Sequence, residues 1–143
     1  MFATTRTRYG LRAICCLARR QGALTSSREI AVEEGIPRRY LQSLLRDLAA
    51  AGLLQVVRGR TGGYRLAKEA SHISIAAISE AVGDPLTPIF CLGCRRAELG
   101  CAAHQAWKRL GEEFRRVLSR TTVAQLCPPL RAPRSRPPRQ PPS

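Results

Sequence analysis

A glycine and a proline separate two short amphipathic segments in residues 26–52. Ser26, with Glu29 three residues later, forms a capping-box pattern that predicts the start of a helix. Gly35 should end that helix, and Pro37 suits the first turn of the next, because a proline there loses no hydrogen bond. Two helices joined by so short a turn predict a helix-turn-helix unit.

The second of these segments has one apolar face and one polar face. Its leucines recur at spacings of three and four residues, and Gly52 follows where a helix should stop. The opposite face carries residue types that contact phosphates and base edges. The DNA contacts predicted from this segment are Arg38, Arg39, Tyr40, Gln42 and Ser43.

A short hairpin with a basic tip is predicted next. Residues 53–57 form an apolar run, a glycine-rich turn follows, and residues 64–66 alternate apolar and polar. Arg58 and Arg60 lie in the turn, where glycine lets the backbone approach a phosphate or enter a minor groove. We therefore predict a winged helix-turn-helix, a mainly α fold with a small β-hairpin wing, which binds double-stranded DNA.

Composition also favours an anionic partner. The 143 residues include 24 Lys+Arg against 10 Asp+Glu, a formal net charge of +14, and nearly all the cations are arginine. This length allows one domain with a core and an appendage. The sequence shows neither an apolar run that would span a bilayer nor a signal-peptide pattern, so we expect no membrane association and a cytoplasmic location.

The six cysteines are expected to serve metal or redox chemistry. Thiols stay reduced in the cytosol, which argues against a disulfide framework. Cys15 and Cys16 should point about 100° apart on a helix predicted over Tyr9–Arg20, and are expected to be small apolar core residues. Cys127, at the end of a last short helix, is also expected to be a packing residue.

Four potential metal ligands occur within fourteen positions: Cys91, Cys94, Cys101 and His104. The last two are three residues apart and would share one face of a helix beginning there. This set suits a tetrahedral zinc, and equally an iron–sulfur cluster with one histidine ligand. A third alternative is a thiol oxidoreductase that uses the Cys-x-x-Cys pair, but no βαβ pattern surrounds that pair.

A longer helix is predicted after the last of these ligands. Trp107, Leu110, Phe114 and Val117 form an apolar stripe that suits a dimer seam, and a dimer would address two half-sites of DNA. The predicted divisions are a DNA-binding domain in residues 1–84, a cysteine-containing cluster loop in 85–104, a dimerisation helix and short terminal helix in 105–127, and a disordered Pro/Arg-rich tail in 128–143.

Over about residues 1–127 the chain resembles the Rrf2 family of bacterial regulators, which includes the IscR and NsrR types. The motifs are Thr5-Arg6-x-Arg8-Tyr9-x-Leu11, Ile36-Pro37-x-x-Tyr40-Leu41-Gln42-x-Leu44, Gly52-Leu53, Val57-Arg58-Gly59-x-x-Gly62-Gly63-Tyr64-x-Leu66-Ala67 and Cys101-x-x-His104-x-x-Trp107.

The resemblance implies a homodimeric transcription regulator, either repressor or activator, and not an enzyme. Its operator affinity would depend on an iron–sulfur cluster that responds to iron, redox state or nitric oxide. In IscR-like members three cysteines and a histidine hold a 2Fe-2S cluster, which would map onto Cys91, Cys94, Cys101 and His104. The alternatives are a 4Fe-4S cluster, a structural zinc, or a DNA-binding regulator with no metal.

Overall fold

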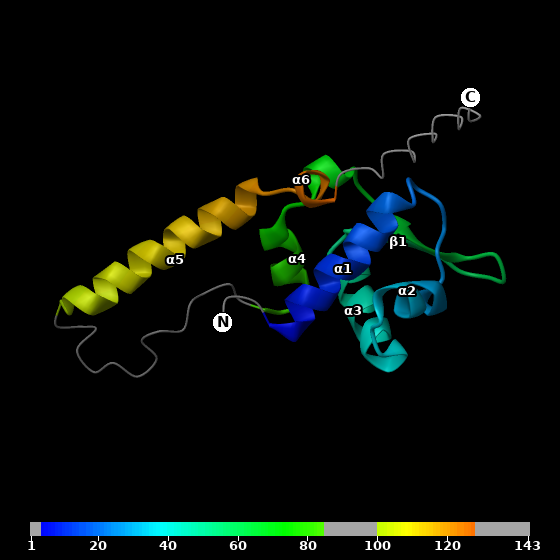
Figure 1. Ribbon diagram of the computed structural model, residues 1–143, viewed down its shortest axis with the longest axis horizontal. Helices are drawn as coiled ribbons and strands as arrows, with labels where there is room; N and C mark the ends of the chain where they lie inside the picture. The colour runs from blue at the N-terminus through cyan, green and yellow to red at the C-terminus, as the bar shows by residue number, and fades with distance from the viewer. Residues whose placement is uncertain (1–3, 85–99, 128–143) are drawn as a thin grey trace, which may run out of the picture.

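The computed structural model describes residues 4–84 and 100–127 (Figure 1). Its elements in chain order are α1 (Thr5–Arg19), α2 (Ser27–Glu34), α3 (Arg38–Ala50), β1 (Leu54–Val57), β2 (Gly63–Leu66), the 3-10 helix η1 (Ala70–His72), α4 (Ile75–Ala81), α5 (Ala102–Arg120) and α6 (Val123–Leu126). This confirms the predicted mainly α fold with a two-stranded hairpin. No helix within the described ranges is long and apolar enough to cross a membrane. The tail predicted to be disordered, residues 128–143, lies outside these ranges.

Helix α1 lies at the centre of the fold and begins one turn earlier than its apolar pattern predicted. Thr4 is the cap, because its hydroxyl accepts a hydrogen bond from the backbone N–H of Thr7. The fully buried face of α1 includes Ile14 and Leu17. This face joins the core formed by α2, α3 and α4.

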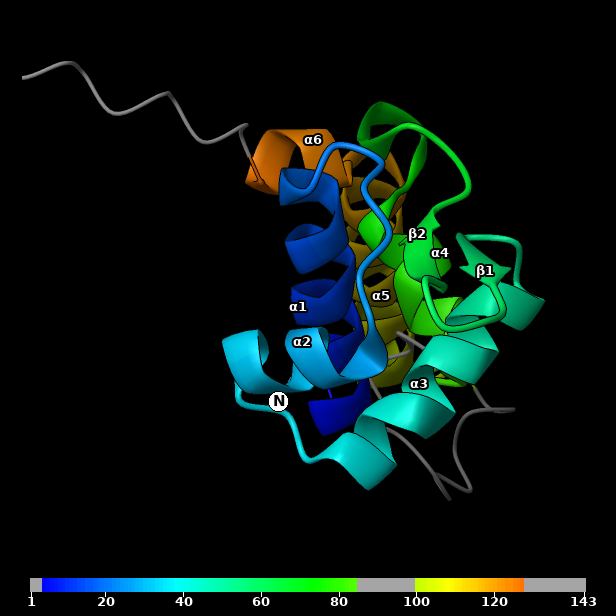
Figure 2. The same cartoon turned by 90° about the vertical axis from the view of Figure 1, so that its right-hand side faces the viewer.

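The helix-turn-helix forms as the sequence predicted. The Ser26 hydroxyl accepts from the backbone N–H of Glu29 at 3.2 Å, and the Glu29 carboxylate accepts from the Ser26 N–H at 2.7 Å. Gly35 ends α2 with φ 62°, in the left-handed region that favours glycine. Pro37 caps α3. Figure 2 shows α2 and α3 packed over α1, with α3 beside the hairpin.

The wing is an antiparallel pair of strands in which Val56 faces Tyr64. The backbone of Tyr64 also pairs with that of Thr25, through hydrogen bonds of 2.8 and 3.0 Å, and this joins the wing to the segment before α2. Close packing explains the glycines at the base of the turn. A Cβ on Gly62 would lie 2.0 Å from the carbonyl oxygen of Val57, so no other residue fits without moving the backbone.

Helix α5 contacts the winged domain through α4 and extends away from it (Figure 1). The short segment after α5 returns to the domain: the backbone N–H of Val123 donates to the carbonyl of Ile73 at 2.9 Å, and that of Ile75 donates to Thr121 at 3.0 Å. Thr122 and Gln125 form a capping box at the start of α6. The Val123 side chain is fully buried in the core.

Candidate nucleic-acid interface and metal site

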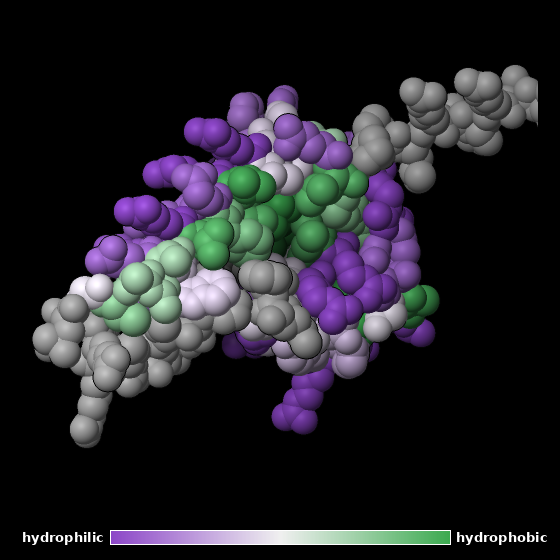
Figure 3. Space-filling view, turned by 60° about the vertical axis from the view of Figure 1, so that its left-hand side comes forward, coloured by the Kyte–Doolittle hydropathy of each residue, from purple (hydrophilic) through white to green (hydrophobic). Residues whose placement is uncertain are grey.

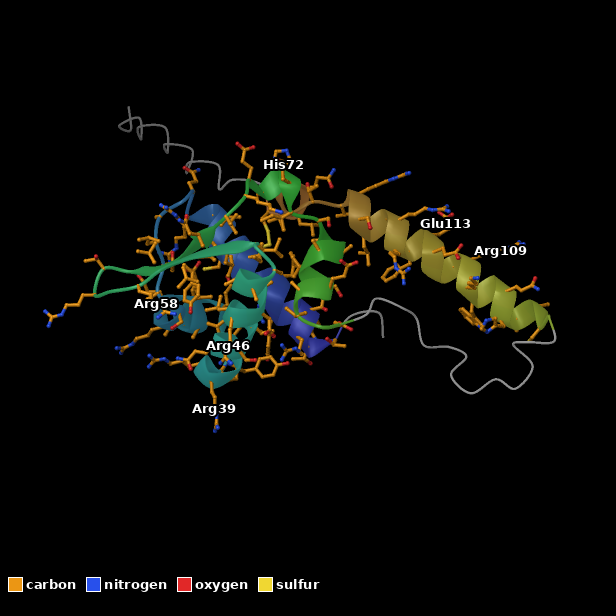
Figure 4. All side chains as sticks on the ribbon, turned by 180° about the vertical axis from the view of Figure 1, so that it is seen from behind. Arg39, Arg46, Arg58, His72, Arg109 and Glu113 are labelled. Atoms are coloured by element: carbon orange, nitrogen blue, oxygen red, sulfur yellow. A yellow bond between two sulfur atoms is a disulfide. The ribbon has the colours of Figure 1, made fainter. Side chains whose placement is uncertain are left out.

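Helix α3 separates its apolar and polar residues as the sequence predicted. Leu41, Leu44, Leu45 and Leu48 are fully buried. Arg38, Arg39, Gln42 and Arg46 are exposed on the other side, while Ser43 is half-buried. In Figure 4 the side chain of Arg39 points away from the body of the molecule and Arg46 lies farther along the same helix. The leucine face thus orients the polar face outward.

The exposed side chains of α3 remain available for a ligand. Within residues 4–84 and 100–127, Arg38, Arg39, Gln42 and Arg46 form no side-chain hydrogen bond or ion pair. A guanidinium group without an intramolecular acceptor can donate two parallel hydrogen bonds to a phosphate or to a guanine edge. The geometry therefore suits an anionic polymer.

Tyr40, predicted to contact DNA, faces α1 instead of extending beside these arginines. Its ring meets that of Tyr9 edge to face, with centroids 5.6 Å apart. The guanidinium of Arg6 lies 5.9 Å from the centre of the Tyr40 ring. Tyr40 is half-buried, so its ring contributes to the α1–α3 packing that supports the exposed arginines.

The wing places Arg58 and Arg60 in an exposed turn. Neither forms a side-chain hydrogen bond or ion pair within the described part of the chain. Arg65 differs, because its Nε donates at 2.8 Å to the side-chain oxygen of Gln55, its partner across the strands. The wing therefore offers two unengaged cations on the element next to α3.

Ion pairs neutralise the acidic end of α2. Glu33 pairs with Arg19 and Arg20, and Glu34 pairs with Arg19 and Arg12. The hydrogen bond from Arg20 lowers the pKa of Glu33, so that carboxylate stays ionised. These arginines belong to α1 and to the residue that follows it. Among the described residues, Glu33 and Glu34 therefore form no ion pair with the arginines of α3.

Arg6 joins three elements, which the sequence did not indicate. Its Nε donates to the carbonyl of Val82 at 2.8 Å, and its Nη2 pairs with Asp47 of α3. Arg6 and Arg12 are engaged within the protein, and Arg8 is exposed.

Asp84, which precedes the predicted cluster loop, is held against the start of α1. Its carboxylate accepts from the Thr4 hydroxyl at 2.7 Å, the Thr4 backbone N–H at 3.1 Å and the Thr7 hydroxyl. Burial raises the pKa of Asp84, but these hydrogen bonds outweigh burial and leave the pKa below its usual value. The acid and its donors are about eighty residues apart, so no local pattern could have identified this contact.

Two of the four predicted metal ligands lie within the described residues. Cys101 caps the start of α5 and His104 lies in its first turn, so the two share a face as expected. The His104 Nδ1 atom is buried and has no hydrogen-bond partner among the described residues. A buried imidazole nitrogen without a hydrogen-bond partner fits a metal ligand. Cys91 and Cys94 fall in residues 85–99, outside the described ranges.

A second group of metal-ligand types lies between α1 and α2, where ligand atoms of Cys16, Glu33 and Glu34 are within 4.8 Å of one another. Burial, with a smaller contribution from the two carboxylates, raises the pKa of the Cys16 thiol to about 11. A protonated thiol is a poor ligand, and both carboxylates are already paired with arginines. This group is explained by ion pairing.

The prediction that Cys15 and Cys127 are unbonded packing residues was wrong. Cys15 and Cys127 form a disulfide, with Cα atoms 5.9 Å apart, although both were expected to be packing residues. The two are separated by 112 positions. The return of the chain after α5 brings the two cysteines together. No local sequence pattern predicts a contact between residues so far apart in the chain.

The comparisons with known proteins agree with this geometry. The family model described as "Rrf2: Iron-dependent Transcriptional regulator" matches residues 3–129. The HTH-type transcriptional regulator IscR of Yersinia enterocolitica is 33% identical over 129 residues, which cover 88% of this chain and 79% of that protein.

Two solved structures show the same architecture. CymR, the global cysteine regulator of B. subtilis, matches with a TM-score of 0.73 and 30% identity, over 89% of this chain and 96% of that one. IscR of T. potens matches with a TM-score of 0.70 and 28% identity, over 88% of this chain and 85% of that one. With its winged helix-turn-helix and a family match over residues 3–129, the chain belongs to the Rrf2 family of transcriptional regulators, which are not enzymes.

Proposed function

We propose that this regulator binds operator DNA as a homodimer in the cytoplasm, and that an iron–sulfur cluster controls the binding. The observation that carries the DNA-binding part is the outward face of α3. It presents Arg38, Arg39 and Gln42, whose side chains have no hydrogen-bond or ion-pair partner among the residues that the structure describes, next to a wing that carries Arg58 and Arg60. A helix of this kind enters the major groove, and the wing contacts the adjacent backbone or minor groove.

The dimer is proposed from the apolar stripe on α5. Trp107, Leu110 and Val117 are 40%, 56% and 58% exposed. Figure 3 shows apolar colouring along one flank of α5, beside a polar flank. An apolar stripe on an extended helix is best covered by the same stripe of a second copy, as in an isologous interface.

The cluster is proposed to be held by Cys91, Cys94, Cys101 and His104. The buried Nδ1 of His104 supports this, since nothing among the described residues satisfies it. When bound, a cluster with mixed cysteine and histidine ligands supplies chemistry that is sensitive to iron supply, oxidants and nitric oxide. The resemblance of the ligand set to that of IscR-like members favours a 2Fe-2S form, and two of the similar proteins carry the IscR name.

The ligand positions suggest how control would reach the DNA-binding surface. Cys101 is the N-cap of α5 and His104 lies in its first turn, and α5 carries the proposed dimer seam. On the other side of the loop, Asp84 is held to α1, and Arg6 links Val82 to Asp47 of α3. A cluster held between these two attachment points would therefore couple the seam to the recognition helix.

The test is anaerobic purification followed by iron, sulfide and zinc analysis, visible absorbance and operator titration at fixed salt. Wild type should contain iron and sulfide, and Cys101→Ala and His104→Ala should lose both together with high-affinity operator binding. Cys16→Ala and His72→Ala are the matched controls, because Cys16 is a buried thiol of α1 and His72 is the exposed second histidine. A colourless wild type that contains zinc would replace the sensing proposal with a structural site.

A further inference from the structure

The segment after α5 is attached to the winged domain by contacts that involve no cysteine. Thr121 accepts a backbone hydrogen bond from Ile75, and Val123 donates one to Ile73. Ser74 and Thr122 form a β-bridge between the same two segments. With the Val123 side chain fully buried as well, the chain can hold α6 in place whether or not a disulfide is present.

A disulfide strengthens this attachment at the C-terminal end of α6. Cys127 is bonded to Cys15, in the middle of the helix that supports α3 through the Tyr9–Tyr40 contact. The disulfide therefore connects the end of the α5–α6 unit to the scaffold of the recognition helix. It involves none of the four predicted cluster ligands.

We propose that Cys15 and Cys127 form a reversible thiol–disulfide pair, a second redox site whose oxidation clamps α6 to α1. Disulfides in cytosolic proteins are usually transient and redox sensing, so the proposed cytoplasmic location favours a bond that opens and closes. The noncovalent contacts of Val123 favour the same conclusion, because they keep α6 docked when the bond is broken.

The oxidant is a low-molecular-weight disulfide, RSSR. The Cys127 thiolate attacks one sulfur of RSSR and expels RS⁻, which forms the mixed disulfide Cys127–S–S–R. The Cys15 thiolate then attacks the Cys127 sulfur and expels the second RS⁻. The two protons that leave the cysteines are taken up by these thiolates, so RSSR is reduced to two RSH as one protein disulfide forms.

The two cysteines are suited to different steps of this exchange. Cys127 is partly exposed and is the sulfur that an outside thiol or disulfide reaches first, whereas Cys15 is buried in the core. The adjacent Cys16 does not compete, because burial raises the pKa of its thiol to about 11 and keeps it protonated. Of the two adjacent thiols of α1, Cys15 is therefore the one that takes part in the exchange.

The clamp also has a consequence for DNA binding, and this part rests on the proposed dimeric operator binding. If α5 carries the dimer seam, fixing its end to α1 narrows the range of positions that each α3 takes relative to the seam. A dimer restricted in this way loses less conformational entropy on engaging two half-sites. Oxidation should therefore tighten operator binding by at least about 5-fold, the lower end of typical coupling between sites.

The experiment uses the full chain, equilibrated in buffers with graded ratios of reduced to oxidised glutathione. Reduced thiols are alkylated, and the cysteine-containing peptides are identified by mass spectrometry. The proposal expects Cys15 and Cys127 to become protected together, reversibly, at one midpoint ratio. Cys16→Ala should show the same midpoint, and Cys127→Ser should leave Cys15 alkylated at every ratio. A bond that resists reduction throughout, or protection of Cys15 in Cys127→Ser, overturns the proposal.

Two further readouts separate this inference from the proposed function. Hydrogen exchange in α6 should be faster in reduced than in oxidised wild type and equal in both states of Cys127→Ser; no difference in wild type counts against the clamp. A DNA duplex selected by the chain from random sequences is then titrated in both redox states. Loss of the difference in Cys127→Ser supports the coupling, and a difference retained there assigns it to another site. If no duplex binds in any state, the proposed operator binding fails, while thiol protection and hydrogen exchange still decide the redox pair.

Discussion

Among the residues on the outer face of α3, Gln42 has the side chain best suited to read a base. Its amide carries a donor and an acceptor side by side, which matches the edge of adenine. It is exposed and forms no hydrogen bond with the described residues. The arginines around it can instead contact phosphates, which position a protein without reading sequence.

We expect Gln42→Ala to lower discrimination at one base pair per half-site by roughly 1 to 3 kcal/mol, because a bidentate pair is lost. Titration of a selected duplex and its single-base variants at fixed salt measures this. Gln105→Ala removes a glutamine from α5 instead of α3 and should leave discrimination unchanged. Equal discrimination by Gln42→Ala and wild type at every position would exclude Gln42 as a reading residue.

Asp84 gives the fold a dependence on low pH. Its pKa is below the usual value in the folded protein, so the carboxylate contributes stability above the unfolded pKa of about 3.9. That contribution is lost as the pH falls from there through the folded pKa, because protonation removes the acceptor for Thr4 and Thr7.

Asp84→Asn should therefore reduce the free energy of unfolding at pH 7 and flatten its decline below about pH 4. Urea unfolding at a series of pH values measures both effects. Glu80→Gln, at an exposed carboxyl of α4, is the matched control. If the free energies of unfolding of wild type and Asp84→Asn differ by the same amount at every pH measured, Asp84 is not the titrating group.

At the scale of the elements, the wing depends on close backbone packing at its turn. The position of a Cβ at Gly62 is taken by the Val57 carbonyl, and that at Gly63 lies 2.7 Å from the Thr25 oxygen. These approaches join the hairpin to the segment before α2. The orientation of Arg58 and Arg60 relative to α3 therefore depends on two glycines.

Gly62→Ala should destabilise the wing by roughly 1 to 3 kcal/mol, as expected for overpacking. Faster hydrogen exchange in β1 and β2, with α1 unchanged, would report a local effect. Thr61→Ala, at the exposed neighbouring position, is the control and should exchange like wild type. If Gly62→Ala also exchanges like wild type, the turn has room that this structure does not show.

At the scale of the whole molecule, α5 has a charged flank and an apolar flank. Figure 4 shows Arg109 and Glu113 projecting from the helix, and the apolar stripe includes Leu110 and Val117. Pairing of two such stripes would leave the charged flanks in solvent. It would also place two copies of α3 on the same assembly.

The double variant Leu110→Glu/Val117→Glu should be monomeric, because a carboxylate buried in an apolar seam without a partner is costly. It should also bind a two-half-site duplex more weakly than wild type. Sedimentation velocity and DNA titration measure these effects. Lys108→Glu changes the net charge by the same amount from another side of α5, and should remain dimeric. A double variant that sediments as a dimer places the seam elsewhere.

The helices and the wing were predictable because their signals are local. The Ser26–Glu29 capping box, Gly35 and Pro37 act within about one helical turn. The structure shows the capping box and Gly35 in their expected roles, and it places Pro37 at the N-cap, one residue before α3. The leucine period of α3 fixes which face is buried, and therefore which arginines are exposed. The outward face of the candidate DNA interface follows from the same periodicity.

Contacts between distant residues were decided by the tertiary structure. Cys15 and Cys127 read as packing residues in the sequence, and only the return of the chain after α5 brings them together. Asp84 meets Thr4 across 80 positions, and Tyr40 turns its ring toward Tyr9 instead of outward. The helices, the wing and the basic face could be predicted from local patterns, because each depends on residues close together in the chain. Contacts between residues far apart in the sequence depend on packing. A residue's type limits the groups that it can bind, but the tertiary structure decides which of those groups lies next to it.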